Sequence, residues 1–291
     1  MRTIPSSELI MNDDGSIFHL HLKPEQLADI VILVGDPGRV AMVASFFDTQ
    51  ECSVSNREFN TVTGTYKGKR MTVLSTGIGI GNIDISVTEL DALANVDFAT
   101  RQEKAQKRQL TLVRLGTSGA IQPDIKVGQF VFARTSVGFD GLLNYYKGRN
   151  EVCDLEIEKA FMKHTGWSDL LPKPYFIDAD PSLAELFRDV TIEGITIAAP
   201  GFYAPQGRWV RLEPADIHLN EKIESFDYHG RRVTNFEMES SALAGLAALM
   251  GHKAATICTI IAQRIALDAC TDYKPFVRKM IQTALDKLAT L

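Results

Sequence analysis

The stretch DIVILVGDPGRVAMVASFF, residues 29–47, joins a strand to a helix through a tight turn. Its first part is a short run of Ile, Val and Leu that ends at Gly35, a pattern typical of a strand buried on both faces. Pro37 follows, and proline suits the first turn of a helix because that turn does not need the missing N–H. We therefore predict a buried strand over 29–35 and a helix over 37–47.

The same alternation continues along the chain. Further strands are predicted over 70–76, 110–115, 129–137, 194–199 and 255–262, and further helices over 83–93, 240–250 and 277–288. Strands that are apolar throughout and alternate with helices are typical of a mostly parallel sheet covered on both faces. The expected fold class is therefore α/β.

The composition is that of a soluble globular chain with a large core: 291 residues, 45% hydrophobic and 23% charged. A net charge of −5 gives no reason to expect nucleic-acid binding. The four cysteines lie far apart without a C-x-x-C pair, which argues against a zinc site or a disulfide framework and fits a reducing cytosol. No apolar run is long enough to span a membrane and no signal-peptide pattern opens the chain, so we expect a cytoplasmic protein.

One domain is expected over residues 1–291, since α/β domains of this size are common. Residues 1–17 are interpreted as an N-terminal extension. Residues 94–109 end in RQEKAQKRQ and are interpreted as a charged insertion, either an exposed turn or a continuation of the preceding helix. We expect this insertion to be solvated rather than to form a binding surface.

Two groups of residues at the carboxyl ends of predicted strands are candidates for anion binding, because ligands of open α/β sheets bind there. Gly35 to Arg39 combine free backbone N–H groups with a guanidinium, although a simple tight turn is the alternative. Arg114 lies inside an apolar strand, so it must be paired, either in a structural ion pair or with a bound phosphate. Thr117 and Ser118 beside it add hydroxyl donors, which favours phosphate.

Two later stretches are candidates for binding a sugar and a planar base. Glu237 and Glu239 in NFEMES stand just before an apolar helix, so they either cap that helix or accept two sugar hydroxyls. The stretch FYAPQGR, residues 202–208, offers an aromatic ring, an amide and a guanidinium. These groups suit a base with carbonyl and N–H edges, and a plain surface loop is the alternative.

Two other motifs do not support the functions they suggest at first sight. Gly77-x-Gly-x-Gly81 fails the dinucleotide fingerprint, because the third glycine should fall at Asn82. The loop is instead expected to let its backbone approach a ligand closely. His19 and His21 could share one strand face, but no third ligand is apparent, so no metal site is expected.

Taken together, the motifs FHL, VGDPGRV, NREF, STGIG, RLGTSGAIQP, FYAPQGR, NFEMES and a late strand ending in Gln-Arg resemble the nucleoside phosphorylase-I family, and its uridine phosphorylase branch in particular. The resemblance runs from about Phe18 to the last helix. It implies a single nucleoside phosphorylase domain. Its sheet would be mixed, mostly parallel, twisted and partly barrel-like, with helices on its flanks.

The resemblance also implies a role for each matching residue. The phosphate site would hold Gly35, Arg39, Arg114 and Thr117, with Arg57 from a neighbouring subunit. The ribose site would hold Met238 and Glu239, with His19 from the same neighbour, and the base site Phe202, Gln206, Arg208, Ser118 and Gly119. Arg264 would close over the site, while Arg114, Glu239 and Arg208 would carry the chemistry.

The implied reaction is the reversible phosphorolysis of uridine to uracil and ribose 1-phosphate, with phosphate as co-substrate and no metal or organic cofactor. The implied assembly is a homodimer, or a hexamer built from dimers, with shared active sites. The sequence does not decide whether uridine, thymidine or deoxyuridine is the preferred substrate. Nor does it decide whether the protein is a dimer or a hexamer.

Three other functions are weighed against this one. Related purine enzymes use an aspartate after the late strand to protonate the base, whereas this chain has no acid there before Asp268. Hydrolytic nucleosidases, and a non-enzymatic nucleoside-binding protein, would have no use for three converging arginines. The pyrimidine phosphorylase is therefore favoured over all three.

Two positions depart from the family pattern. Gln263 stands before Arg264 where relatives usually have asparagine, and Ala204-Pro205 stand where a glycine next to Gln206 is usual. Either departure is expected to bear on loop closure or substrate preference.

Overall fold

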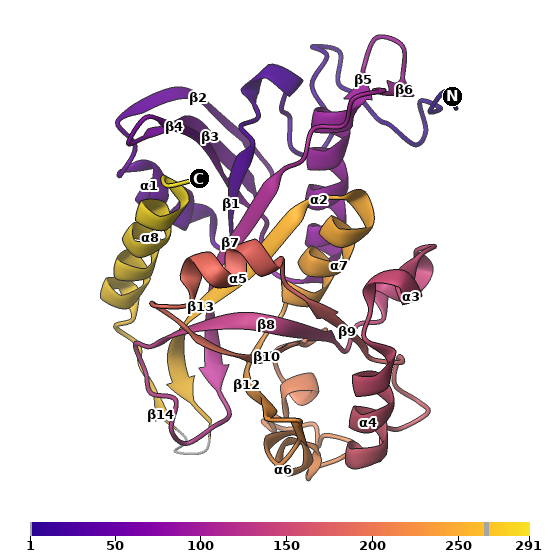
Figure 1. Cartoon of the computed structure of the whole chain (residues 1–291), viewed down its shortest axis with the longest axis vertical. Coiled ribbons are helices and arrows are strands. Elements are labelled where there is room, and N and C mark those ends of the chain that lie inside the picture. The colour runs from indigo at the N-terminus through magenta and orange to yellow at the C-terminus, as the bar shows by residue number, and fades with distance from the viewer. Residues whose placement is uncertain (1, 265–267) are drawn as a thin grey trace.

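The computed structural model describes residues 2–264 and 268–291, and within them one large mixed sheet is flanked by helices (Figure 1). The twelve strands of the sheet are β1 (Ile30–Val34), β2 (Thr49–Asn56), β3 (Phe59–Tyr66), β4 (Lys69–Ser75), β7 (Thr111–Ala120), β8 (Phe130–Gly138), β9 (Tyr175–Asp178), β10 (Ile192–Ala198), β11 (Asp227–Tyr228), β12 (Arg231–Glu237), β13 (Lys253–Gln263) and β14 (Asp268–Ala269). The helices are α1 (Pro37–Ala44), α2 (Ile80–Asn95), α3 (Arg149–Val152), α4 (Leu155–Thr165), α5 (Pro181–Phe187), α6 (Leu219–Glu224), α7 (Ser240–Met250) and α8 (Lys274–Leu288).

Five of the strands close on themselves. The sheet runs β12-β10-β8-β13-β7, and β7 pairs back onto β12 through Gly119 and Ala120. Parallel ladders join β4, β1, β7 and β13, and also β8, β10 and β12, whereas β8 meets β13 antiparallel. This confirms the expected α/β fold with a mixed, mostly parallel and partly barrel-like sheet.

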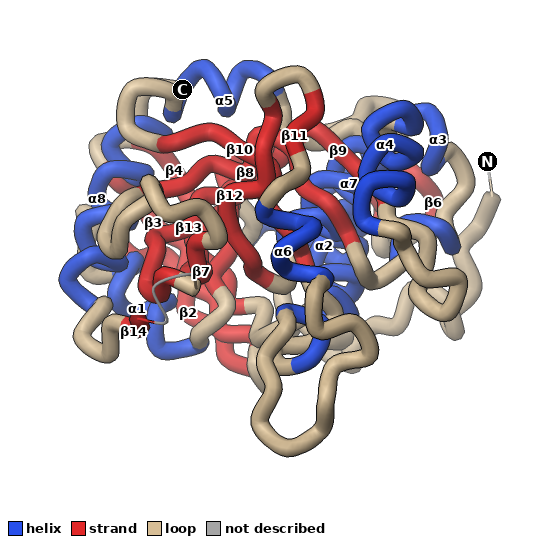
Figure 2. The backbone as a smooth tube through the Cα atoms, turned by 90° about the horizontal axis from the view of Figure 1, so that it is seen from below, coloured by secondary structure: helices blue, strands red, loops and turns tan. Residues whose placement is uncertain are grey.

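The strand β1 is buried on both faces, as its continuous apolar sequence predicts. Val31 and Leu33 belong to a core cluster with α2 and α7, while Ile32 and Val34 belong to a second cluster with α1, α5 and α8. Figure 2 shows the strands at the centre with helices on either side of them. Both faces of the sheet are therefore covered, which is the condition for a parallel sheet of this kind.

The predicted elements are all present, and some bounds differ. The helix predicted over 240–250 matches α7, but the helix predicted over 37–47 ends at Ala44. The strand predicted over 110–115 is longer than expected, because it continues as β7 to Ala120. Pairing with β13 along its whole length and with β12 at its end holds this glycine-containing segment extended.

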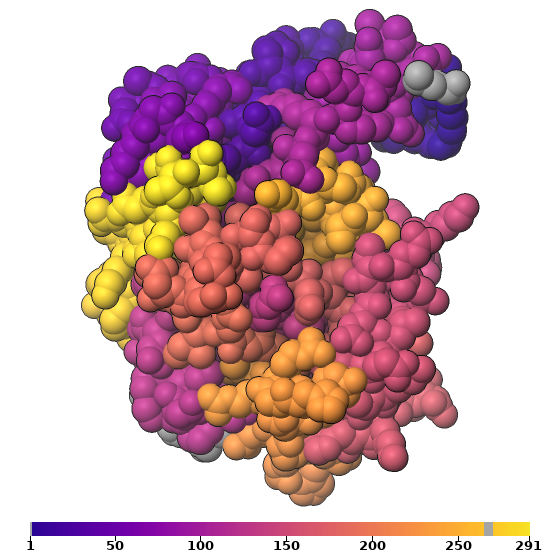
Figure 3. All heavy atoms as spheres, viewed as in Figure 1, coloured from indigo at the N-terminus to yellow at the C-terminus, as the bar shows by residue number. Residues whose placement is uncertain are grey.

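The charged stretch 94–109 is neither a simple turn nor a helix extension. It forms a hairpin of β5 (Val96–Asp97) and β6 (Gln102–Glu103), which packs on the N-terminal segment. Arg101 donates to the carbonyl oxygens of Ile4 (2.8 Å) and Pro5 (3.0 Å). Hairpin and N-terminal segment together project from the body of the molecule in Figure 3.

No helix within residues 2–264 and 268–291 combines the length and the apolar character needed to cross a lipid bilayer.

Candidate active site

A cavity of about 1150 Å³ opens where β1, β7, β12 and β13 end. Most of the predicted site residues line it, namely Gly35, Arg39, Arg114, Thr117, Ser118, Gly119, Phe202, Gln206, Arg208, Met238, Glu239 and Arg264. Within the described residues, Arg57 and His19 are the two members of the predicted set outside its lining. The strand ends thus gather residues that lie up to about 230 positions apart in the sequence.

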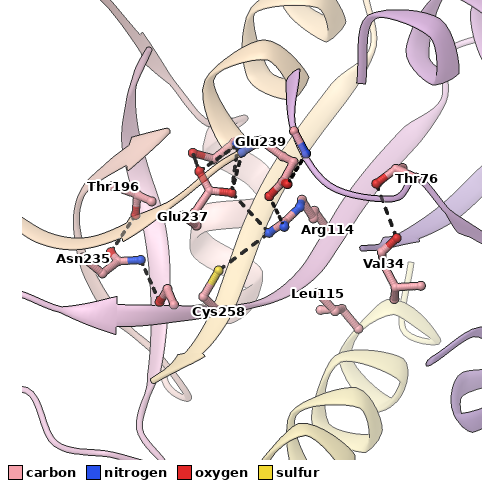
Figure 4. Close-up of polar contacts among 12 residues, drawn as sticks. Val34, Thr76, Arg114, Leu115, Thr196, Asn235, Glu237, Glu239 and Cys258 are labelled. Atoms are coloured by element: carbon pink, nitrogen blue, oxygen red, sulfur yellow. Dashed lines mark hydrogen bonds and ion pairs between the residues drawn. The ribbon is translucent and has the colours of Figure 1, made fainter. Parts of the chain in front are cut away.

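Arg114 on β7 lies between two carboxylates (Figure 4). Its Nη1 is 3.2 Å from Glu237, and its Nη2 donates to Glu239. Its Nε has no hydrogen-bond partner among the described residues. Burial alone would lower the pKa of Arg114, but the charges of Glu239 and Glu237 outweigh burial and raise it. Arg114 therefore remains charged and is both a structural ion pair and a lining group of the cavity.

The two neighbouring glutamates have different tasks. Glu237 accepts hydrogen bonds from the N–H groups of Glu239 and Ser240, both at 2.9 Å, and from the Ser240 hydroxyl at 2.6 Å, so it caps α7. Glu239 makes no such cap bond in the described structure and instead accepts the Gly79 N–H at 2.6 Å beside Arg114. The cap hypothesis thus applies to Glu237, and the ligand-binding hypothesis remains for Glu239.

Burial raises the pKa of Glu237 above its ordinary value, because it removes the charged carboxylate from water. Arg114 partly offsets this rise, whereas the negative charge of Glu239 adds to it. Two carboxylates thus share the single guanidinium of Arg114, and Glu237 binds a proton more readily than a free glutamate does.

Arg39 lies on the first turn of α1 and is only 8% exposed. Its Nη1 donates to the carbonyl oxygen of Leu115 at 3.1 Å. Burial, and then the positive charge of Arg114, lower the pKa of Arg39. Two desolvated guanidiniums thus face one cavity, which favours the binding of an anion between them.

Glycines bring the loops of this region close together. A Cβ on Gly35 would lie 3.3 Å from the carbonyl oxygen of Gly77. Gly77 and Gly79 have φ angles of +71° and +94°, which side chains rarely adopt. The loop therefore brings its backbone to the cavity, where the Gly79 N–H reaches Glu239.

Three of the predicted base-binding residues, Phe202, Gln206 and Arg208, are held together. Arg208 Nη1 donates to Gln206 Oε1 at 2.6 Å, and its guanidinium lies 3.7 Å from the centroid of the Phe202 ring. Arg264 donates to the backbone oxygen of Gln206. Burial and the charge of Arg208 lower the pKa of Arg264 to about 10, so both guanidiniums are close together and partly desolvated.

The two departures from the family pattern have separate places. Gln263 turns its amide onto the carbonyl oxygens of Gln122 (2.7 Å) and Ile125 (3.2 Å). Ala204 and Pro205 start a short 3₁₀ turn, Ala204–Gln206, that holds the backbone of Gln206. The side chain of Asp268, the first acid after the late strand, lies outside the described residues.

Arg57 and His19 lie together and do not line the cavity, although Glu58 next to Arg57 does. Arg57 stands in the turn between β2 and β3 with a φ of +54°, and its guanidinium lies 5.6 Å from the centroid of the Phe18 ring. Asn56 next to it donates to the carbonyl oxygen of His19 at 2.8 Å. The loop of His19 and the turn of Arg57 are thus held against each other.

Sequence reasoning missed several lining residues, among them Glu58, Asn82, Trp209, Phe236 and Cys270. Trp209 and Phe236 lie beside or inside quoted motifs, and their size and apolar character next to polar groups were a usable signal. Glu58 lies inside the NREF motif and Asn82 directly after Gly81, but neither residue type by itself indicates a ligand contact. Within residues 2–264 and 268–291, no group of three or more His, Cys, Asp and Glu side chains could hold a metal ion.

The chain is similar to known proteins over most of its length. The family model described as phosphorylase superfamily matches residues 29–291. A uridine phosphorylase of Thermococcus kodakarensis is 33% identical over 89% of this chain and 82% of its own length. A DeoD-type purine nucleoside phosphorylase of Anoxybacillus flavithermus is 30% identical over 92% of this chain and 97% of its own length.

A solved structure is also similar. It is that of a Trypanosoma brucei nucleoside phosphorylase described as showing uridine phosphorylase activity. It superposes with a TM-score of 0.89 at 28% identity, over 97% of this chain and all of the other.

Proposed function

The chain belongs to the phosphorylase superfamily, and from this we propose that it is a uridine phosphorylase, which converts uridine and phosphate to uracil and ribose 1-phosphate and runs in both directions. The observation that carries the proposal is the cavity itself. Two buried guanidiniums, Arg39 and Arg114, and the carboxylate of Glu239 line the same space. An anion and a polyol could bind there side by side.

Phosphate is the attacking group. It is already an anion, so it needs no general base, and the task of the protein is to hold it in line with C1′ of the ribose. Arg39 and Arg114 would bind it, with Gly35 and Thr117 alongside. Burial and the charge of Arg114 both disfavour the charged form of Arg39, and a bound anion would offset this, which supports the role.

The ribose passes through an oxocarbenium-like state as the bond from C1′ to N1 breaks and the bond from phosphate oxygen to C1′ forms. Glu239 would accept the ribose hydroxyls, beside Met238. For this, the carboxylate exchanges its present bonds to the Gly79 N–H and Arg114 for bonds to substrate.

The leaving uracil takes the electron pair of the broken bond. Arg208 and Gln206 would stabilise its negative charge, and such oriented donors are worth roughly 3–4 kcal/mol each. Arg264 would close over the base, next to Ser118, Gly119 and Phe202. No metal ion and no organic cofactor enters these steps.

The site is proposed to be shared between subunits, in a homodimer or a hexamer built from dimers. Arg57 would add a third guanidinium to the phosphate, and His19 would reach the 5′ end of the ribose, both from the neighbouring subunit. Both residues lie on neighbouring segments and neither lines the chain's own cavity, which supports this arrangement. We further propose that the protein is cytoplasmic and acts in pyrimidine salvage.

A purine nucleoside phosphorylase is the second candidate, because a purine enzyme is similar at 30% identity. The segment Ile261–Arg264 offers no carboxylate that could protonate a purine, whereas Gln206 and Arg208 lie ready for a base that leaves as an anion. These groups favour a pyrimidine nucleoside over a purine nucleoside as the substrate.

The proposal is tested by incubating the purified protein with uridine, with and without phosphate, and measuring uracil and ribose 1-phosphate by chromatography. We expect uracil to appear only with phosphate and in equal amount to ribose 1-phosphate. Equal rates without phosphate, with free ribose as product, would identify a hydrolase instead. Thymidine, deoxyuridine and inosine in parallel assays give the substrate preference.

A further inference from the structure

The carboxylate of Glu89 on α2 contacts three nitrogen atoms of the loop that carries His19. Its carboxylate accepts the backbone N–H of His19 at 3.1 Å and that of Leu20 at 2.9 Å. The same carboxylate lies 2.6 Å from Nδ1 of the His19 ring. The side chains of Glu89 and His19 are 13% and 27% exposed, so the contact is largely shielded from water.

This contact decides which nitrogen of the ring carries hydrogen. An ionised carboxylate can only accept hydrogen bonds, so Nδ1 must carry the hydrogen that lies between it and Glu89. In a neutral ring, Nε2 is then a bare acceptor. The edges of Phe18 and Phe59, with ring centroids 4.8 and 6.5 Å away, limit how far the His19 ring can turn.

We propose that Glu89 is a positioning residue that presents His19 Nε2 as a hydrogen-bond acceptor to the 5′-hydroxyl of the ribose, and that it thereby selects nucleosides with a hydrogen on the 5′ oxygen. The inference rests on the proposed function, which places His19 at the 5′ end of the sugar in a neighbouring subunit. What is new is that His19 accepts the hydrogen bond from the 5′-hydroxyl, and that Glu89 is the residue that makes it an acceptor. A 5′ substituent that only accepts would meet the Nε2 lone pair and be disfavoured.

Glu89→Gln tests whether His19 Nε2 accepts or donates, because glutamine has nearly the same shape as glutamate. The amide oxygen can still accept the backbone N–H groups, while the amide NH₂ can donate to Nδ1, so that Nε2 becomes a donor. The substrates are uridine, 5′-deoxyuridine and 5′-deoxy-5′-fluorouridine, in which fluorine is close to hydroxyl in size but carries no hydrogen.

For the natural sequence we expect kcat/KM to be about tenfold or more higher for uridine than for the fluoro compound. Glu89→Gln should narrow this ratio several-fold while leaving 5′-deoxyuridine unchanged. In a His19→Ala background the same substitution should have no effect on the ratio. If Glu89→Gln lowers kcat/KM equally for all three substrates, or leaves the ratio of uridine to the fluoro compound unchanged, the proposal is wrong.

A second measurement keeps this outcome separate from the proposed function. ¹⁵N NMR of the His19 ring in the free protein should show hydrogen on Nδ1, and in Glu89→Gln on Nε2. Hydrogen on Nε2 of the natural protein would overturn the inference even if uridine is cleaved. An absence of phosphate-dependent uridine cleavage would instead refute the proposed function, whatever the ring shows.

Discussion

Arg114 and Glu237 form a buried ion pair, with 3.2 Å between Nη1 and the nearest carboxylate oxygen and neither side chain more than 6% exposed. The pair couples the cap of α7 to the floor of the cavity, because Glu237 binds the first N–H groups of that helix. Glu239, two residues on, shares the same guanidinium. Because the fold raises the pKa of Glu237, we expect the stability of the protein to depend on pH through this cluster.

Glu237→Gln should change that dependence. The folded protein raises the pKa of Glu237 from 4.5 to about 7, so it binds a proton more tightly than the unfolded chain does. The contribution of this group to stability is therefore present below about pH 4.5 and is lost as the pH rises toward 7. Between pH 5 and 7.5, the melting temperature should fall less in the variant than in the natural protein. Glu193→Gln on the exposed face of β10 is the control, and an equal slope in all three proteins would contradict the assignment.

Arg39→Met should separate phosphate binding from folding. Burial and the charge of Arg114 both disfavour the charged form of Arg39, so its loss should leave the melting temperature without phosphate unchanged or raised. The KM for phosphate should rise at least about tenfold, since a charge-assisted hydrogen bond is lost.

The thermal shift caused by phosphate is the direct measurement. A ligand at 100 times its Kd stabilises by about 2.7 kcal/mol, and a tenfold rise in Kd lowers this gain to about 1.4 kcal/mol, so the shift in Arg39→Met should be about half as large or smaller. Arg188→Met, at an exposed ion pair with Glu185, should keep the full shift. A full shift in Arg39→Met would remove Arg39 from the phosphate site.

Arg208→Leu should lower kcat/KM for uridine by about 100-fold, because the anionic uracil loses an oriented donor. Any activity on inosine should fall much less, since a purine leaves best as a protonated, neutral base. The exposed Arg211 lies on the same loop, and Arg211→Leu serves as the control. Equal losses on both nucleosides would mean that Arg208 does not read the base.

Arg57→Ala and Glu239→Ala should each be inactive alone and partly active when mixed. Each dimer made of one subunit of either kind has one site with both residues intact, so random exchange restores about a quarter of the sites. Activity is followed after the subunits have exchanged, with exchange confirmed by labelled subunits. If activity does not return, Arg57 acts within its own subunit or not at all.

The sequence predicted the elements whose apolar residues follow a regular pattern, including α8 with its single apolar stripe. β1 and α7 are apolar throughout, so their pattern does not depend on distant partners. The hairpin of β2 and β3 escaped prediction because β2 is mostly exposed and rich in polar residues. Its strand conformation comes from pairing with β3, which pairs in turn with β4.

The same limit applies to the candidate site. The residue types of Arg39, Arg114 and Arg208 were visible, because a guanidinium in an apolar or glycine-rich context is unusual. The division of tasks between Glu237 and Glu239 was not visible, since it depends on which carboxylate faces the helix end and which the cavity. The partnership of Glu89 with His19 spans 70 positions and had no local signal.

The closed circle of β12, β10, β8, β13 and β7 has a mechanical consequence. Arg114 stands on a strand that is held by neighbours on both sides, so the base of the cavity cannot widen without breaking ladders in two directions. Any motion that opens the cavity to substrate must therefore occur at its rim, in the loops 76–79 and 199–218. Deuterium should therefore replace amide hydrogens quickly along the rim and last of all along β7.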